Sequence, residues 1–148
     1  MKAFKYAFEG VFAAVKSERN MRIHLAFAFY VVLAGMVTRI SLVEWGVVIV
    51  CMAAVMSLEI LNTAIEALCD EVSAEYSPKI KLAKDAAAGS VLVSAIASAI
   101  IGCIIFFSGG RPIMALEFAQ NNILAAGIIV LTLPAWIIFI FKTRRSHK

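Results

Sequence analysis

Four long apolar segments constrain this 148-residue chain more than any other feature. They cover residues 23–37, 45–57, 91–107 and 123–141, and the second is expected to continue as a helix through Leu68. A helix needs about 20 apolar residues to cross a hydrocarbon core of roughly 30 Å, and the first segment reaches this length only with its flanks. With 62% hydrophobic and 16% charged residues, the chain has too few polar side chains to cover a soluble domain. We therefore predict an all-α integral membrane protein.

The first 16 residues predict a helix of a different kind. Apolar side chains recur in this segment with helical spacing, whereas its lysines and glutamate lie off that stripe. Amphipathic helices of this type lie in the membrane interface rather than crossing it. We expect an N-terminal surface helix whose apolar stripe is formed by Phe4, Ala7, Phe8, Val11, Phe12 and Val15.

The basic residues predict the topology. All lysines and arginines except Arg39 and Arg111 lie before the first span, between the second and third, or after the fourth. The positive-inside rule makes this side cytoplasmic, so both termini and the 70–85 loop should face the cytoplasm. This asymmetry and the attraction of basic residues to anionic lipid account for the net charge of +4. We therefore expect no nucleic-acid partner.

The second apolar segment carries polar side chains that a lipid-facing helix cannot tolerate. At about 100° per residue they fall on one face, which must point into a helix bundle. Glu59 lies about 16 Å of helix from Asp70, too deep to be interfacial, and is a candidate general base. Asp70 and Glu71 nearer the loop can equally pair with neighbouring lysines and arginines. The face consists of Glu59, Asn62, Thr63, Glu66 and Asp70.

Two further polar clusters lie at the same cytoplasmic boundary. Glu18 stands at the junction of the surface helix and the first span, and Lys84 and Asp85 open the third span. Paired carboxylates such as Glu18 and Glu66 can hold a divalent ion that takes its other ligands from phosphates and water. A lysine nearby supplies charge to phosphate oxygens. This pattern is typical of phosphoryl transfer from a cytoplasmic nucleotide to a lipid alcohol.

The segment SLEILNTAIEALCDEVSAEYSPKIKLAKDAAAGSV resembles the signature of the bacterial diacylglycerol kinase family. In that family an E-x-x-N-S/T-A-I-E-x-x-x-D helix precedes an A-K-D-x-x-A/G-A/G turn. The resemblance covers about residues 2–107, and the junction KSERNMRIH is more similar to the undecaprenol kinase branch. It implies a homotrimer in the bacterial cytoplasmic membrane, with the active site facing the cytoplasm, ATP as phosphoryl donor and Mg²⁺ as cofactor.

The resemblance also implies roles for individual residues. It makes Glu59 the catalytic base, with Asn62 hydrogen-bonding nearby, and it makes Glu18 and Glu66 the magnesium carboxylates. It assigns Lys84 to the ATP phosphates. The remaining residues that it places near the nucleotide are Tyr6, Glu75, Tyr76, Ser77 and Asp85.

The C-terminal part departs from the family pattern, which usually ends after the third span. We expect a kinase-like membrane domain over residues 1–107, followed over 108–148 by a loop, an additional span and a basic cytoplasmic tail. The sequence favours a lipid kinase that phosphorylates undecaprenol, with diacylglycerol as the alternative acceptor. Two alternatives are not enzymes: a small proton-coupled transporter and a membrane scaffold. Transporters, however, generally have more spans and internal repeats.

Overall fold

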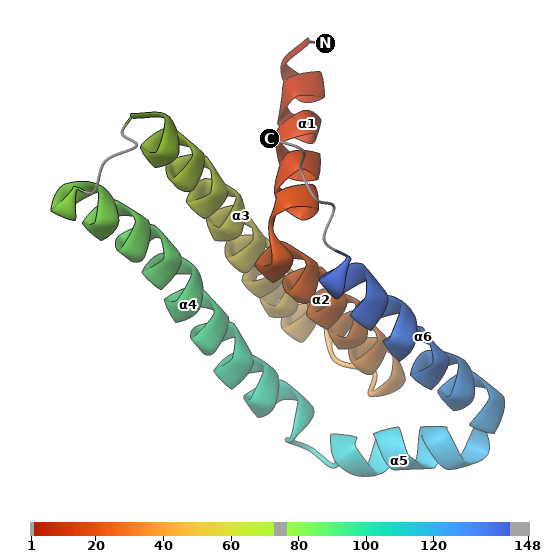
Figure 1. Cartoon of the computed structure of the whole chain (residues 1–148). Helices are drawn as coiled ribbons and strands as arrows, with labels where there is room; N and C mark the ends of the chain where they lie inside the picture. The colour runs from red at the N-terminus through yellow and green to blue at the C-terminus, as the bar shows by residue number, and fades with distance from the viewer. Residues whose placement is uncertain (1, 73–76, 143–148) are drawn as a thin grey trace.

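The computed structural model describes residues 2–72 and 77–142, and over these residues every regular element is a helix (Figure 1). This confirms the predicted all-α class. The helices are α1 (Lys2–Ser17), α2 (Arg19–Val37), α3 (Leu42–Val72), α4 (Pro78–Phe106), α5 (Arg111–Asn121) and α6 (Ile123–Phe141).

Within the described residues, four helices are long and apolar enough to cross a membrane: α2, α3, α4 and α6. They contain the four segments that the sequence predicted. The 31 residues of α3 and 29 of α4 exceed the roughly 20 that a span requires. At 1.5 Å per residue α3 is about 46 Å long, so it has room for both an apolar span and a polar end.

The helices form an antiparallel bundle in which α3 and α4 pair along their length, and α2 packs between α3 and α6 (Figure 1). The start of α2, the end of α3, the start of α4 and the end of α6 all point toward the same end of the bundle. We call this end, which carries most of the basic residues, the polar end. Helix α1 bends away from α2 there and contacts both α2 and α3.

Much of the apolar surface is uncovered in the single chain. On α1 the stripe residues Phe4, Phe8 and Phe12 are 76%, 62% and 69% exposed, and none of the residues of α6, all of them described, is buried. Apolar patches of this extent mark contact with lipid or another protein. The position of α1 in the membrane interface stays a prediction.

The segment between the third and fourth spans differs from our expectation. We expected a loop, but residues Arg111–Asn121 form helix α5, which joins α4 to α6 at the end opposite the polar end (Figure 1). Gly110 precedes it with a positive φ of 76°, and Pro112 lies in its first turn. Proline is favoured there, because it lacks only an N–H that the helix leaves unpaired anyway. The Gly-Gly-x-Pro sequence therefore starts a helix as well as forming a turn.

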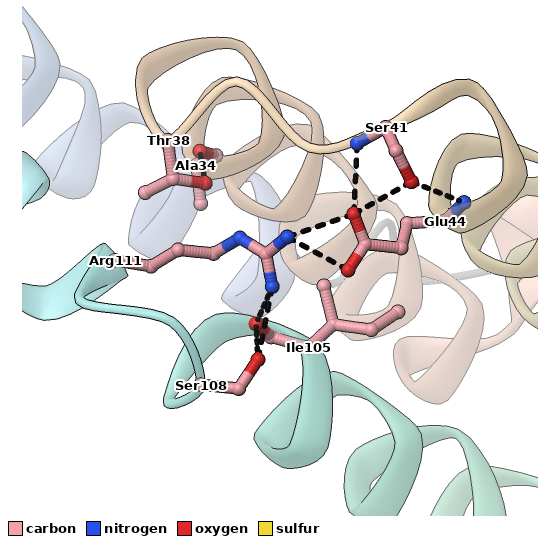
Figure 2. Close-up of polar contacts among 7 residues, drawn as sticks. All are labelled: Ala34, Thr38, Ser41, Glu44, Ile105, Ser108 and Arg111. Carbon is pink, nitrogen blue, oxygen red and sulfur yellow. Dashed lines mark hydrogen bonds and ion pairs between the residues drawn. The ribbon is translucent and has the colours of Figure 1, made fainter.

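An ion pair fixes this opposite end (Figure 2). Arg111 donates from Nη2 to both carboxylate oxygens of Glu44, at 2.7 and 2.8 Å, and from Nη1 to the Ile105 carbonyl and the Ser108 hydroxyl. The backbone N–H of Ser41 donates to Glu44 at 2.8 Å. These contacts connect the start of α3 to the corner between α4 and α5.

The last turn of α2 requires a glycine where it meets the start of α3. A Cβ atom built on Gly35 would lie 2.8 Å from Cη2 and 2.9 Å from Cζ2 of Trp45. Trp45 also packs against a small apolar core of Ile40, Val48 and Ile105. The absence of a side chain at Gly35 lets the indole close this end of the bundle.

Candidate active site

The most deeply buried polar group of the described chain is Glu59 in α3, which is 1% exposed. Asn62, one turn further along, is 6% exposed. Both lie on the face of α3 that the sequence predicted to point inward, and α1, α2 and α4 all pack against this helix. The polar face of α3 therefore places the Glu59 carboxylate inside the bundle.

Glu59 and Asn62 also have acceptor atoms without partners. Among the described residues, neither Oε1 of Glu59 nor Oδ1 of Asn62 receives a hydrogen bond, although both atoms are buried. Buried acceptors are normally satisfied, and leaving one unpaired costs about 1–3 kcal/mol. A bound molecule that brings a hydroxyl would donate a hydrogen bond to one of them.

Two more carboxylates lie close to Glu59. The Nδ2 of Asn62 donates to Oε1 of Glu66 at 2.9 Å, which fixes that carboxylate one turn further along α3. Glu18, at the bend between α1 and α2, and Glu66 both lie within electrostatic range of Glu59. The structure therefore brings together three acidic residues that the sequence places up to 48 positions apart.

This donor set fits a magnesium ion of the kind that nucleotides carry. Over residues 2–72 and 77–142, no group of three or more His, Cys, Asp or Glu side chains is arranged to hold a metal by itself. Mg²⁺ in phosphoryl-transfer sites, however, needs only one or two carboxylates, because phosphates and water supply the other ligands. Glu18 and Glu66 are the two carboxylates that the sequence predicted for this role, and their part in holding an ion stays a prediction.

Lys84 lies at the polar end of the α3–α4 pair. Its Nζ forms an ion pair with Oδ1 of Asp70 and lies within electrostatic range of Glu66. Asp70 thus pairs with a lysine, as one of the two readings of its role predicted. The contact places a cation next to the carboxylates of Asp70 and Glu66 at the polar end.

Other predicted nucleotide residues lie further out. Asp85 pairs with Lys81 at 3.0 Å, and both side chains are 62% exposed. Ser77 precedes α4 as its N-cap residue in an extended conformation. Tyr6 is 64% exposed and lies about 18 Å along α1 from Glu18. Glu75 and Tyr76 lie outside the described residues.

Sequence reasoning missed the role of Arg22, which it counted only as a basic residue. The side chain is 7% exposed, and its Nη1 donates to the carbonyls of Val15 at 3.2 Å and Lys16 at 3.0 Å. Its Nε donates to the carbonyl of Ile140 at 3.2 Å. An arginine directly before the first apolar segment, four residues after Glu18, was the available signal.

An apolar cavity of about 570 Å³ lies between α2, α3 and α4. On α3 it begins at Val55 and Met56, one turn from Glu59, and on α4 it reaches Phe107 near the opposite end of the bundle. Its lining is apolar apart from a few groups such as His24 and Ser98. A hydrocarbon chain is the kind of ligand that such a cavity accommodates.

Comparison with known proteins gives one family. The family described as prokaryotic diacylglycerol kinase matches residues 5–106. The chain is 41% identical to the undecaprenol kinase of Bacillus subtilis over 105 residues, which are 71% of this chain and 85% of that protein. It is 40% identical to a diacylglycerol kinase of Synechocystis over 101 residues, 68% of this chain and 58% of that protein.

A third relative extends the comparison. The chain is 33% identical to the diacylglycerol kinase of Escherichia coli over 114 residues, covering 73% of this chain and 88% of that protein. The family match includes α1 to α4 and ends at residue 106, so α5 and α6 lie beyond it. These matches confirm the resemblance that the motif around Glu59 predicted. The chain is therefore a multi-pass membrane protein and a lipid kinase that belongs to the prokaryotic diacylglycerol kinase family.

Proposed function

We propose that this lipid kinase transfers the γ-phosphoryl group of Mg-ATP to the hydroxyl of undecaprenol, at the cytoplasmic face of a bacterial cell membrane. The observation that carries the proposal is the buried carboxylate of Glu59, with one acceptor oxygen unpaired among the described residues. Toward the polar end of the bundle, Glu59 is followed by the carboxylates of Glu18 and Glu66 and by Lys84. In the other direction along α3, the apolar cavity begins one turn away.

In this proposal Glu59 is the general base. The lipid hydroxyl donates its proton to Glu59 while its oxygen forms a bond to the γ-phosphorus. The bond between that phosphorus and the β–γ bridging oxygen breaks, so ADP leaves and a phosphate monoester remains. Asn62 holds Glu66 through its Nδ2, and its buried Oδ1, which has no partner among the described residues, remains available to accept a hydrogen bond.

Glu18 and Glu66 would hold the magnesium ion, which supplies positive charge to the β- and γ-phosphate oxygens. Lys84 would exchange its contact with Asp70 for a phosphate oxygen, since a lysine ammonium binds phosphate as a point charge. We assign contacts with the nucleoside to Glu75, Tyr76 and Ser77, and positions near the nucleotide to Tyr6 and Asp85, as the family resemblance implies.

The choice of acceptor rests on similarity. The Bacillus subtilis relative is named an undecaprenol kinase, and the junction around Glu18 is more similar to that branch. The cavity begins one turn from Glu59 and runs beside α4 for about 18 Å, from Ala95 to Phe107, the residue after α4. It accommodates a hydrocarbon chain of either acceptor and therefore does not decide between them. Diacylglycerol is the second candidate, because the Synechocystis and Escherichia coli relatives are named diacylglycerol kinases.

We also propose a homotrimer, as the family resemblance implies. In the single chain Tyr6 lies far from Glu18 along α1. A trimer would allow Tyr6 of one subunit to complete the nucleotide site of its neighbour. Cross-linking in native membranes tests this assembly independently of activity.

The proposed acceptor is tested with purified full-length protein in detergent, radiolabelled ATP and equal mole fractions of undecaprenol or diacylglycerol. We expect kcat/KM for undecaprenol to exceed that for diacylglycerol by at least about tenfold, since hydrophobic pockets discriminate by 10- to 200-fold. A preference for diacylglycerol would replace the acceptor and leave the mechanism intact. Labelling of neither lipid by a well-assembled protein would overturn the proposed reaction.

A further inference from the structure

The C-terminal end of α6 contacts the bend that carries Glu18. The family match ends at residue 106, so α6 lies outside the part shared with the family. Yet Ile140, the second-last residue of α6, accepts a hydrogen bond from Nε of Arg22 at 3.2 Å. The same guanidinium donates from Nη1 to Val15 and Lys16, in the last turn of α1.

Helix ends explain why one arginine makes these three bonds. The last four carbonyls of a helix have no partner within it, and Val15, Lys16 and Ile140 all occupy such positions. A cation at a helix C-terminus also interacts favourably with the helix dipole. Because Arg22 is 7% exposed, its charge is compensated by these carbonyls rather than by bulk water.

A second contact joins the same elements. The guanidinium carbon of Arg19 lies 4.7 Å from the centre of the Phe141 ring, at cation–π distance. Arg19 directly follows Glu18, which is the N-cap residue of α2, and Arg22 follows one turn later. The two arginines that follow Glu18 in the first turn of α2 therefore contact the last two residues of α6.

We propose that α6 is a working part of the kinase site, and that Arg22 is a positioning residue that couples the end of α6 to the metal-binding carboxylate of Glu18. The inference rests on the proposed role of Glu18 in holding the metal. Arg22 fixes the angle at which α1 leaves α2, and α6 supplies one of the three carbonyls that hold the guanidinium. Loss of the α6 contacts shifts the bend and withdraws Glu18 from the ion.

The test uses the full-length protein and measures Mn²⁺ binding in the presence of a non-hydrolysable ATP analogue, from the electron paramagnetic resonance signal of free Mn²⁺. The magnesium concentration for half-maximal kinase activity is a second readout. Arg22→Lys keeps the charge but loses the planar set of donors. Phe141→Leu keeps apolar bulk but removes the ring beneath Arg19, and Phe141→Trp restores an aromatic face.

We expect Arg22→Lys to weaken Mn²⁺ binding by about tenfold, the lower end of the effect of groups that orient a metal ligand. Phe141→Leu should weaken it by about two- to fivefold, the scale of one exposed cation–π contact, and Phe141→Trp should restore it. The KM for the lipid should stay unchanged in all three variants.

The matched control breaks a contact between α2 and α6 away from Glu18. The hydroxyls of Tyr30 and Thr132 lie 2.8 Å apart, so Tyr30→Phe removes a hydrogen bond between the same two helices. It should leave Mn²⁺ binding unchanged. An equal loss in Tyr30→Phe and Phe141→Leu would mean that α6 acts only through general packing and would overturn the proposal.

Glu18→Gln separates this inference from the proposed function. If Glu18→Gln weakens Mn²⁺ binding but well-assembled Arg22→Lys and Phe141→Leu do not, the coupling to α6 is wrong and the metal site stands. If Glu18→Gln binds Mn²⁺ like the wild type, the metal site itself is wrong, and the inference is wrong with it.

Discussion

Arg111 and Glu44, 67 positions apart in the chain, form a two-pronged ion pair at the end of the bundle opposite the polar end (Figure 2). Glu44 precedes Glu59 by 15 residues on α3, or about 22 Å of helix. The pair joins α3 to the corner at which α5 begins, beyond the family-matched residues. Mutations of this ion pair should therefore change the stability of the fold without changing the candidate active site around Glu59.

The first prediction concerns this pair. Arg111→Met should lower the free energy of unfolding by about 1.5–3 kcal/mol, because hydrogen bonds to a charged group are lost and Glu44 is only 26% exposed. The turnover rate of the folded fraction should stay at the wild-type value. Unfolding in SDS, followed for Arg111→Met, Glu44→Gln and the double variant, gives the coupling energy. A coupling energy of zero would show that the pair does not stabilise the fold.

Gly35 supports a second prediction about stability. Gly35→Ala should cost about 1–3 kcal/mol, because its Cβ would lie within 2.9 Å of two ring carbons of Trp45. Gly46 is the matched control, since a Cβ there meets nothing within 4 Å. Gly46→Ala should be neutral or stabilising by up to about 1 kcal/mol, because alanine favours a helix more than glycine. Equal unfolding curves for the two variants would contradict the packing of Trp45 on Gly35.

The third prediction concerns topology. Four spans place both termini on one side, and the basic residues make that side cytoplasmic. Alkaline phosphatase fused after Gly110 should be active, because this enzyme folds only outside the cytoplasm, whereas a fusion after Lys148 should be inactive. Activity of both fusions would mean that α6 does not cross the membrane.

The fourth prediction concerns the carboxylates at the polar end. Glu66→Gln should raise the magnesium concentration needed for half-maximal activity by about tenfold or more, because an amide is a poorer ligand for a hard cation. Glu71→Gln is the matched control, since Glu71 is exposed on the same helix. If both variants need the same magnesium concentration as the wild type, Glu66 does not hold the ion.

The sequence predicted the parts of this structure that follow from hydrophobicity and helical periodicity. The four apolar segments became α2, α3, α4 and α6, and the polar face of the second segment turned inward at Glu59 and Asn62. The signature around Glu59 identified the family. The contact between Asp70 and Lys84 was one of the alternatives, because both residues lie at the same boundary of adjacent spans.

Contacts between helices that are distant in the chain could not be predicted from the sequence. Nothing in the segment 108–121 distinguishes a loop from a short helix that begins at Gly110, because glycine and proline occur in both. The bonds of Arg22 depend on where α1 and α6 end in space, and backbone carbonyls leave no trace in the side-chain pattern. The role of an arginine at a helix junction therefore appears only in three dimensions.

The central claim is that Glu59 accepts the proton of the lipid hydroxyl. Glu59→Gln preserves the shape of the side chain but leaves no base, whereas Lys84→Ala removes a charge from the proposed phosphate site and serves as the contrasting variant. Lys84→Ala should raise the KM for ATP.

The most direct measurement is the single-turnover rate of Glu59→Gln with saturating Mg-ATP and undecaprenol, on protein whose yield and oligomer size match the wild type. General-base assistance is worth about 10²- to 10⁴-fold, so the rate should fall by that range with little change in the affinity for ATP. A well-assembled Glu59→Gln protein that phosphorylates the lipid at nearly the wild-type rate would contradict the assignment of the base.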